Sequence, residues 1–262
     1  MLAIAAHPDD IEFMMAGTLL LLGDAGWAVH YLNLSSGNLG SMTFSSADTA
    51  RVRRSEAQAA AAQMNAVWHP PICNDLQIFY DDRTLRRLTG TIRAVDPSII
   101  LTHSPQDYME DHMNTCRLTL TAAFARGVPN YRTVPARKPV QTAVTIYHGS
   151  PHGLQDALRR RVVPEAFVDT TTVHVRKRAA LECHKSQRGW LDATQGMNSY
   201  IATMEEFAQR LGSWSGGFTY AEGWRRHAHW GYSDEGDDPL HDALKARYVV
   251  NPAYKPALDQ PR

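Results

Sequence analysis

The first ten residues of the sequence bring together side chains that can bind a metal and activate water. An apolar run, residues 2–6, ends abruptly in His7, Pro8, Asp9 and Asp10. Proline disfavours helical backbone in the residue before it, so we expect His7 to stay extended at the end of a strand. A carboxylate is favourable at the positive end of a helix dipole, so a helix is expected to begin at about Asp10. One imidazole and two carboxylates would then lie on a single tight turn.

A second segment about a hundred residues later repeats this arrangement. The apolar run 98–103 ends in His103, and Asp107, Asp111 and His112 follow in and after a polar loop. If the two apolar runs are neighbouring strands, their polar loops meet at one edge of the sheet. A catalytic zinc site needs three ligands from His and carboxylate side chains, with a further position open to water. The two loops together can supply such a set.

His7, Asp10 and His112 are the expected metal ligands. Asp9 would then lie beside the metal-bound water, where it could act as a general base. Zinc lowers the pKa of that water to about 7, so a neighbouring carboxylate can take its proton. Asp111 would orient one of the ligand imidazoles. Either segment alone is weak evidence, because carboxylates at a helix start are commonly N-caps. Their combination on two strand ends is what favours a metal centre.

The elements that must position these residues alternate between strand and helix. The expected strands are 2–6, 27–34, 75–80, 98–103, 140–148 and 163–169, and the expected helices are 11–26, 48–65, 82–95, 112–126 and 172–187. This alternation predicts an α/β, Rossmann-like fold with a mostly parallel sheet and helices on both faces. Ligands in such sheets gather at the carboxyl ends of the strands. Residues 1–212 are expected to form the catalytic domain, and 213–262, rich in aromatic residues, an extension that packs on it.

Composition limits the class of protein. The 262 residues are 44% apolar and carry 27 basic and 27 acidic side chains, and this neutral balance argues against a nucleic-acid partner. No apolar run reaches the 18 residues that a membrane span needs. A strand that begins at residue 2 leaves no room for a signal peptide. The three cysteines are far apart and are expected to be reduced thiols. We therefore expect a cytoplasmic protein that acts on a small molecule.

The motifs that carry this chemistry resemble those of the PIG-L/LmbE-like family of zinc-dependent N-deacetylases. Residues 6–10, Ala-His-Pro-Asp-Asp, are similar to the AHPDD signature of the family. Residues 103–105 and 107–112 resemble its second motif, HxP followed by DYHPDH. Four further segments give support, and they are the glycine loop 37–40, the RxxE pattern at 53–56, the HxSQ pattern at 184–187 and the YAE pattern at 220–222.

The resemblance implies a Rossmann-like fold and hydrolysis of an N-acetyl group, commonly on an N-acetylglucosamine-type sugar. It implies a bound Zn²⁺, although another divalent metal could take its place. By motif matching, His7, Asp10 and His112 would be the ligands and Asp9 the base, as the residues themselves suggested. Arg53 would hold part of the substrate, a role that comes from the resemblance alone. Related folds often assemble as rings, so a homo-oligomer is expected.

One position departs from the family pattern. Met109 stands where the family usually has the first histidine of DYHPDH, a side chain thought to act as an acid or to stabilise an oxyanion. Methionine can neither donate a proton nor carry a positive charge. Asp9 could serve first as base and then as acid, or another histidine, His103, His148 or His184, could take over.

Other side chains are candidates for contact with substrate or ligands. Tyr108 could bind the substrate carbonyl, or it could only pack beside the metal loop. His148 and His152 flank residues 149–151 just after a strand, and they could line the pocket or be ordinary loop residues. His184 lies near a helix end, where a cation is favourable, so a structural role is as plausible as substrate binding. His103 is expected to join Asp111 behind the metal ligands.

Two other functions compete with an N-deacetylase. A catalytically altered or inactive sugar-binding protein of the same fold would explain Met109, but it would have no use for a water-activating Asp9. A non-haem iron oxygenase also uses two histidines and one carboxylate, which His7, Asp9 and His112 could provide. The expected alternation of strands and helices argues against the oxygenase, because the HxD pattern of that group sits on an all-β fold.

Overall fold

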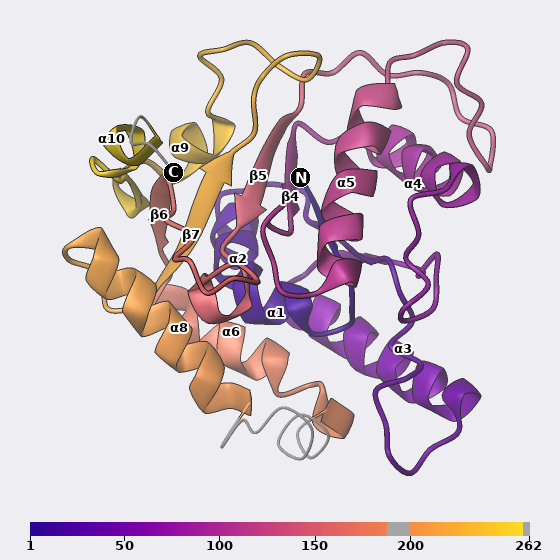
Figure 1. Ribbon diagram of the computed structural model, residues 1–262, viewed down its shortest axis with the longest axis horizontal. Helices are drawn as coiled ribbons and strands as arrows, with labels where there is room; N and C mark the ends of the chain where they lie inside the picture. Colours follow the sequence, from indigo (N-terminus) through magenta and orange to yellow (C-terminus); the bar gives the residue numbers. More distant parts are fainter. Residues whose placement is uncertain (188–199, 259–262) are drawn as a thin grey trace.

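The computed structural model describes residues 1–187 and 200–258. Within these residues eight strands form one sheet in the order β3-β2-β1-β4-β5-β7-β6-β8 (Figure 1). The strands are β1 (Leu2–Ala5), β2 (His30–Asn33), β3 (Val67–His69), β4 (Ile99–Thr102), β5 (Thr145–Gly149), β6 (Ala166–Asp169), β7 (Ala221–Arg226) and β8 (Tyr248–Val250). The α-helices are α1 (Asp10–Met14), α2 (Ala16–Asp24), α3 (Ser46–Gln63), α4 (Asp82–Val95), α5 (Glu110–Ala125), α6 (His174–Leu181), α8 (Tyr200–Ser215), α9 (Pro239–Leu244) and α10 (Tyr254–Leu258).

The sheet has a parallel half and an antiparallel half. Strands β3, β2, β1, β4 and β5 are parallel to one another, whereas the pairs β5–β7, β7–β6 and β6–β8 are antiparallel. The chain proceeds outward from β1 to β3 and then returns to β4 on the other side of β1. The strand order therefore reverses between β1 and β4. Such a switch point opens a crevice at the carboxyl ends of the strands, which is where ligands bind in open α/β sheets.

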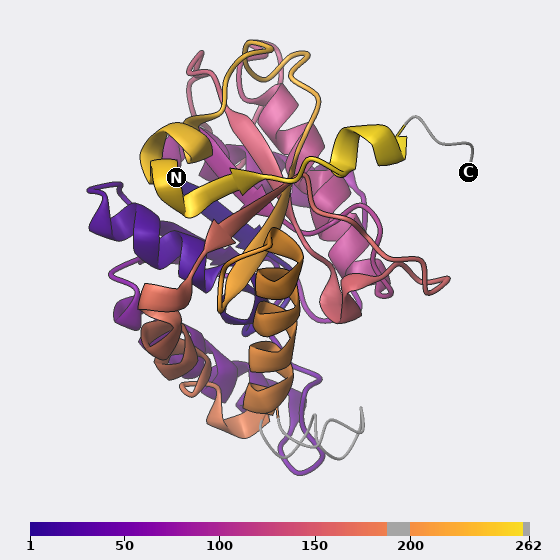
Figure 2. The same ribbon diagram turned by 90° about the vertical axis from the view of Figure 1, so that its left-hand side faces the viewer.

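Helices cover both faces of the sheet, as the sequence predicts. Side chains alternate along β1, so Leu2 and Ile4 pack with residues of α4 and α5, whereas Ala3 and Ala5 pack with residues of α2, α3 and α6. The turned view in Figure 2 shows α2, in indigo, and α5, in magenta, on opposite sides of the strands. Both faces of β1 are buried, which explains why its sequence is a continuous apolar run.

Three predicted elements differ from the structure. The helix predicted at 172–187 is wrong in its extent, because α6 ends at Leu181 and a turn follows it. The strand predicted at 75–80 is wrong, because β3 lies at 67–69 instead. Its three residues are too few to give a pattern, and Val67 is exposed. In the 75–80 segment only Ile78 among the apolar residues packs into a core cluster, so the segment is a loop. The single helix predicted at 11–26 is two helices that meet at Met15, where φ is −129°. Both share one buried apolar face, so the periodicity continues through the break.

The segment after residue 213 is part of the sheet. It supplies β7, which lies between β5 and β6, and the edge strand β8. Its Glu222 carboxylate accepts hydrogen bonds from the backbone nitrogens of Gly17 and Thr18 at the start of α2 and from Lys177 Nζ. The segment thus ties α2 and α6 to the sheet, while its residues 259–262 lie outside the described ranges.

Two further expectations can be compared with the described residues. The three cysteines, all within these ranges, form no disulfide. None of the helices in residues 1–187 and 200–258 has the length and apolar character that a membrane crossing requires.

Candidate metal centre

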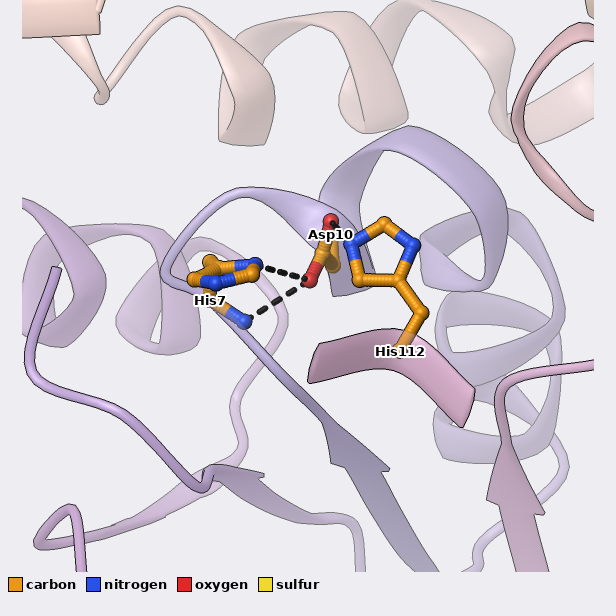
Figure 3. Close-up of side chains that lie close together, drawn as sticks. All are labelled: His7, Asp10 and His112. Atoms are coloured by element: carbon orange, nitrogen blue, oxygen red, sulfur yellow. Dashed lines mark hydrogen bonds and ion pairs between the residues drawn. The ribbon is translucent and has the colours of Figure 1, made fainter. Parts of the chain in front are cut away.

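His7, Asp10 and His112 come together at the carboxyl edge of β1 and β4. His7 follows β1, Asp10 is the first residue of α1, and His112 lies in the first turn of α5. One ligand atom from each of the three lies within 4.8 Å of the others. Figure 3 shows Asp10 between the two imidazoles. His7 Nδ1 is 3.3 Å from Asp10 Oδ2, and His112 Nε2 is 3.5 Å from Asp10 Oδ1.

These separations suit a tetrahedral cation. Two ligand atoms that each lie about 2.0–2.1 Å from zinc are roughly 3.3–3.4 Å apart in a tetrahedron. Burial alone would raise the pKa of Asp10, but His112, His103 and His7 together hold that pKa well below its usual value. The Asp10 carboxylate is therefore ionised, and its negative charge favours a cation at this place. Burial would lower the pKa of His7, yet hydrogen bonds with Asp10 and Asp111 raise it to about 10. Two imidazoles and one carboxylate are a common donor set for catalytic zinc.

Two buried carboxylates hold the outer nitrogens of the ligand imidazoles. His7 Nε2 is 3.1 Å from Asp111 Oδ2, and His112 Nδ1 is 3.1 Å from Asp107 Oδ1. Burial opposes ionisation of both acids, but the histidine partners lower the pKa of each. Carboxylates in this position fix the ring orientation and the tautomer of a metal-binding histidine. Asp111 therefore lies where it can orient the His7 imidazole, as expected, and Asp107 lies in the equivalent position beside His112.

His103 lies directly behind the ligands. Its Nε2 accepts a hydrogen bond from Ala6 N at 2.9 Å and is 3.3 Å from Asp10 Oδ2. Its ring stacks on His112 with centroids 4.2 Å apart. His103, Asp107 and His112 form a second group that could hold a cation. We favour the first group, because His7, Asp10 and His112 line a cavity, whereas His103 and Asp107 are fully buried behind it.

Asp9 is held beside the candidate ligands in a strained backbone conformation. Its φ of 112° lies in a region that residues other than glycine rarely adopt. The guanidinium of Arg53 fixes the turn, because Nη2 donates to Asp9 Oδ2 at 2.9 Å and also to the Pro8 carbonyl. Burial raises the pKa of Asp9, and Arg53 opposes this effect. Strain of about 1–3 kcal/mol at one residue is typical of active sites, where the surrounding structure holds the residue in place.

The glycine loop after β2 makes room for Arg53. A Cβ atom at Gly37, where φ is 74°, would lie 2.6 Å from Arg53 Cδ, and one at Gly40 would lie 2.8 Å from Arg53 Nη1. The Asp75 carboxylate fixes the loop by accepting hydrogen bonds from the backbone nitrogens of Gly37 and Leu39. In this structure Arg53 is thus directed at Asp9, and the resemblance had implied that it holds substrate.

A cavity of about 260 Å³ opens beside the three candidate metal ligands. The residues that line it are His7, Asp9, Asp10, Phe13, Met14, Leu39, Gly40, Arg53, Asp75, Leu76, Tyr108, Met109, His112, His152, Gln187 and Tyr200. Met109 is among them, so the position where the family usually has a histidine does face the reaction space. His152 is also among them, so it takes the first of the two positions expected for it, in the lining of the pocket.

The candidate substrate-binding residues divide into two groups. Tyr108 lines the cavity and meets the His112 ring edge-on, with centroids 5.7 Å apart. His148 lies outside the cavity lining, where its Nε2 meets His227 Nδ1 at 3.1 Å, and burial lowers its pKa to about 3. His184 is also outside, 3.3 Å from a carboxylate oxygen of Glu12. The structure therefore brings Tyr108 to the site and leaves the two histidines behind it.

Asp107 and Asp75 were given no role from the sequence. The signal for Asp107 was its place five residues before His112, in the same polar loop. Asp75 lies in the segment 75–80, which was predicted to be a strand and not a loop at the site, so no role was expected for it.

Comparisons with known proteins identify the family of this chain. The family model described as PIG-L, GlcNAc-PI de-N-acetylase, matches residues 2–123, which include the three candidate ligands and Asp9. Among curated proteins, the chain is 30% identical over 194 residues to 4-oxalmesaconate hydratase of Pseudomonas putida, covering 71% of this chain and 73% of that protein. It is 27% identical over 231 residues to diacetylchitobiose deacetylase of Thermococcus kodakarensis, covering 86% and 81%. The crystal structure of GalB, the 4-carboxy-2-hydroxymuconate hydratase of Pseudomonas putida, matches with a TM-score of 0.72 and 25% identity, covering 87% of this chain and 95% of that one.

Proposed function

This chain belongs to the PIG-L family, and from that premise we propose that it is a metal-dependent hydrolase that removes an acyl group from the nitrogen of a small substrate. The observation that carries the proposal is the convergence of His7, Asp10 and His112 on one wall of a cavity, with Asp9 beside them. Zinc is the metal that best suits these donors. Bound there, it supplies a Lewis acid that makes water a nucleophile near neutral pH and polarises the substrate carbonyl.

Asp9 is the general base of this proposal. Its carboxylate takes a proton from the attacking water, whose oxygen forms a bond to the carbonyl carbon. The carbon–nitrogen bond then breaks, and the proton passes to the leaving nitrogen, so the products are a carboxylate and an amine. Arg53 is a positioning residue, because its hydrogen bonds to Asp9 and to the Pro8 carbonyl fix the direction of the base. A general base typically contributes about 10²- to 10⁴-fold to the rate.

His152 is the side chain best placed to donate the hydrogen bond that Met109 cannot donate. Of the three described histidines that line the cavity, His7 and His112 are the proposed ligands. Within the described part of the chain, neither ring nitrogen of His152 has a hydrogen-bond partner. Burial lowers the pKa of His152, and a neutral imidazole still offers one N–H donor. We assign it to hydrogen bonding with the oxygen that becomes negative during attack.

Hydration of a carbon–carbon double bond is a second candidate function. Its support is the 30% identity with 4-oxalmesaconate hydratase, since the same base and metal could add water to an unsaturated oxo acid. The cavity argues against a substrate with several carboxylates. Among the described residues that line it, Arg53 is the one Lys or Arg side chain and is already paired, whereas Asp9, Asp10 and Asp75 are acidic. Hydrolysis of a neutral amide therefore fits better.

A substrate panel decides between the two functions. Zinc-replete protein is incubated with N-acyl amines and N-acetyl sugars, and released amine is measured with an amine-reactive dye; 4-oxalmesaconate is followed by its absorbance. We expect amine release, and we expect Asp9→Asn to lower kcat by about 10²- to 10⁴-fold with an unchanged zinc content. Glu110→Gln, an exposed change beside the site, is the matched control. Turnover of the unsaturated acid alone, or full activity in Asp9→Asn, would refute the proposal.

A further inference from the structure

Three apolar side chains surround the mouth of the cavity. Leu39, Leu76 and Tyr108 line it and are nevertheless 46%, 62% and 48% exposed. We call them the apolar rim. They come from three separate loops, which follow β2, β3 and β4. Large apolar side chains that remain exposed at the edge of a pocket are typical of a binding surface.

Leu76 is held at the rim in a backbone conformation that suits other residues better. Its φ is 59°, in the left-handed region that glycine and, less readily, asparagine and aspartate adopt. Its N–H donates to Asp111 Oδ2 at 2.8 Å, the same oxygen that lies 3.1 Å from His7 Nε2. The leucine side chain gains little from burial in this chain, because most of it is exposed. Contact with a ligand would supply a reason for leucine at this position.

Another part of the cavity lining is aromatic. Phe13 lies 5.6 Å from Tyr200 and 5.2 Å from His152, measured between ring centroids, and all three line the cavity. We call these three residues the aromatic wall. The rings of Phe13 and Tyr200 offer large apolar surfaces to a bound group, and the His152 ring packs against Phe13 at their edge.

Several polar groups of the lining already have partners inside the protein. The Asp75 carboxylate accepts hydrogen bonds from Ser35 Oγ and from two backbone nitrogens of the glycine loop. The Arg53 guanidinium is paired with Asp9, and Gln187 Nε2 donates to the Gly40 carbonyl. A sugar with several hydroxyl groups would have to compete for these partners or leave its own hydroxyls unpaired, which is costly in a buried site.

We propose that the apolar rim and the aromatic wall form a subsite for an apolar group attached to the scissile amide, so that the protein prefers N-acyl compounds with such a group to N-acetylated sugars. This inference rests on the proposed hydrolase function. The group could belong to the acyl side or to the amine side of the amide. The chemistry of recognition is the same in both cases, and two substrate series distinguish them.

The first series lengthens the acyl chain from acetyl to butanoyl and hexanoyl on glucosamine. The second keeps acetyl and changes the amine from glucosamine to benzylamine. Burial of one methylene is worth about a fourfold change in kcat/KM, so we expect a rise of that order per carbon in the acyl series, or a comparable preference for the aromatic amine. Leu76→Asn, which tolerates the left-handed backbone, should reduce this selectivity at least fivefold. Leu158→Asn, at an exposed leucine outside the cavity lining, is the matched control and should leave the selectivity unchanged.

The outcomes separate this inference from the proposed function. Equal kcat/KM across both series, or unchanged selectivity in Leu76→Asn, overturns the subsite and leaves the hydrolase intact. Absence of turnover for every N-acyl compound refutes the hydrolase and the subsite together. Light scattering supplies a further readout. If Leu76→Asn changes the mass of the particle in solution and not the selectivity, the rim serves a contact between copies of the chain, and the subsite is refuted.

Discussion

We expect Asp111→Ala to weaken zinc binding without removing a ligand. Asp111 Oδ2 lies 3.1 Å from His7 Nε2, and an ionised carboxylate can only accept a hydrogen bond there. The proton must then be on Nε2, which leaves the Nδ1 lone pair directed toward Asp10 and the metal position. Alanine removes both the preference for this tautomer and the restraint on ring rotation.

The magnitude follows from the geometry of the site. Burial alone would raise the pKa of Asp111, but hydrogen bonds with His7 and with Leu76 N lower it, so the carboxylate is ionised at neutral pH. Partners of this kind are worth about 10- to 100-fold in metal affinity, or about 1.4–2.7 kcal/mol. Asp107→Ala should cost a similar amount through His112. Since the two carboxylates belong to one network through His7, Asp10 and His112, their effects are coupled, and the double variant should lose more affinity than either single variant.

Competition with a chromophoric chelator at fixed pH measures these dissociation constants. Glu110→Gln is the control, because Glu110 is an exposed neighbour of Asp111 in the same helical turn. Thermal melting of the metal-free proteins shows whether each variant folds. Folded Asp111→Ala and Asp107→Ala proteins that bind zinc within twofold of the unmodified protein would refute the assignment of both carboxylates.

Two further predictions concern histidines. His152→Ala should lower kcat about 100-fold with little change in zinc content, and adding Met109→His should restore part of the loss; a double variant no faster than His152→Ala would contradict the shared role. The second prediction is that acid destabilises the protein through His148. Burial lowers the pKa of His148 from 6.5 to about 3. The folded protein therefore loses free energy of unfolding as the pH falls from about 6.5 toward 3, because the unfolded chain takes up the proton first. The loss should reach about 3 kcal/mol at pH 4. Urea unfolding at pH 7 and 4 measures this loss, and a His148→Gln protein with the same pH dependence would contradict the cause.

The sequence predicted that His7, Asp10 and His112 converge because two signals, each weak alone, fall at the ends of two apolar runs. His7 and His103 each follow an apolar run that is buried on both faces, and such a run predicts an interior parallel strand. The carboxyl ends of neighbouring parallel strands meet, so the convergence of the two loops followed from the fold class. The fold class itself is confirmed by the central sheet with helices on both faces.

Features that depend on tertiary contacts could not be predicted in this way. Nothing near residue 53 in the sequence indicates that Arg53 reaches back to Asp9, because the approach depends on the turn at Gly37. The His148 ring, on β5, packs against Cys116 and His227, and its sequence neighbours do not show to which side of the sheet it points. β3 was misplaced because a three-residue strand with an exposed first residue carries too little pattern.

The position of a bound metal tests the central claim most directly. Crystals of the zinc-loaded protein, measured on both sides of the zinc absorption edge, would show the ion by its anomalous signal. We predict one strong peak bounded by His7 Nδ1, the Asp10 carboxylate and His112 Nε2, with one side open to the cavity. A peak at another place, such as between His103 and Asp107, or no peak in fully loaded protein, would contradict the account.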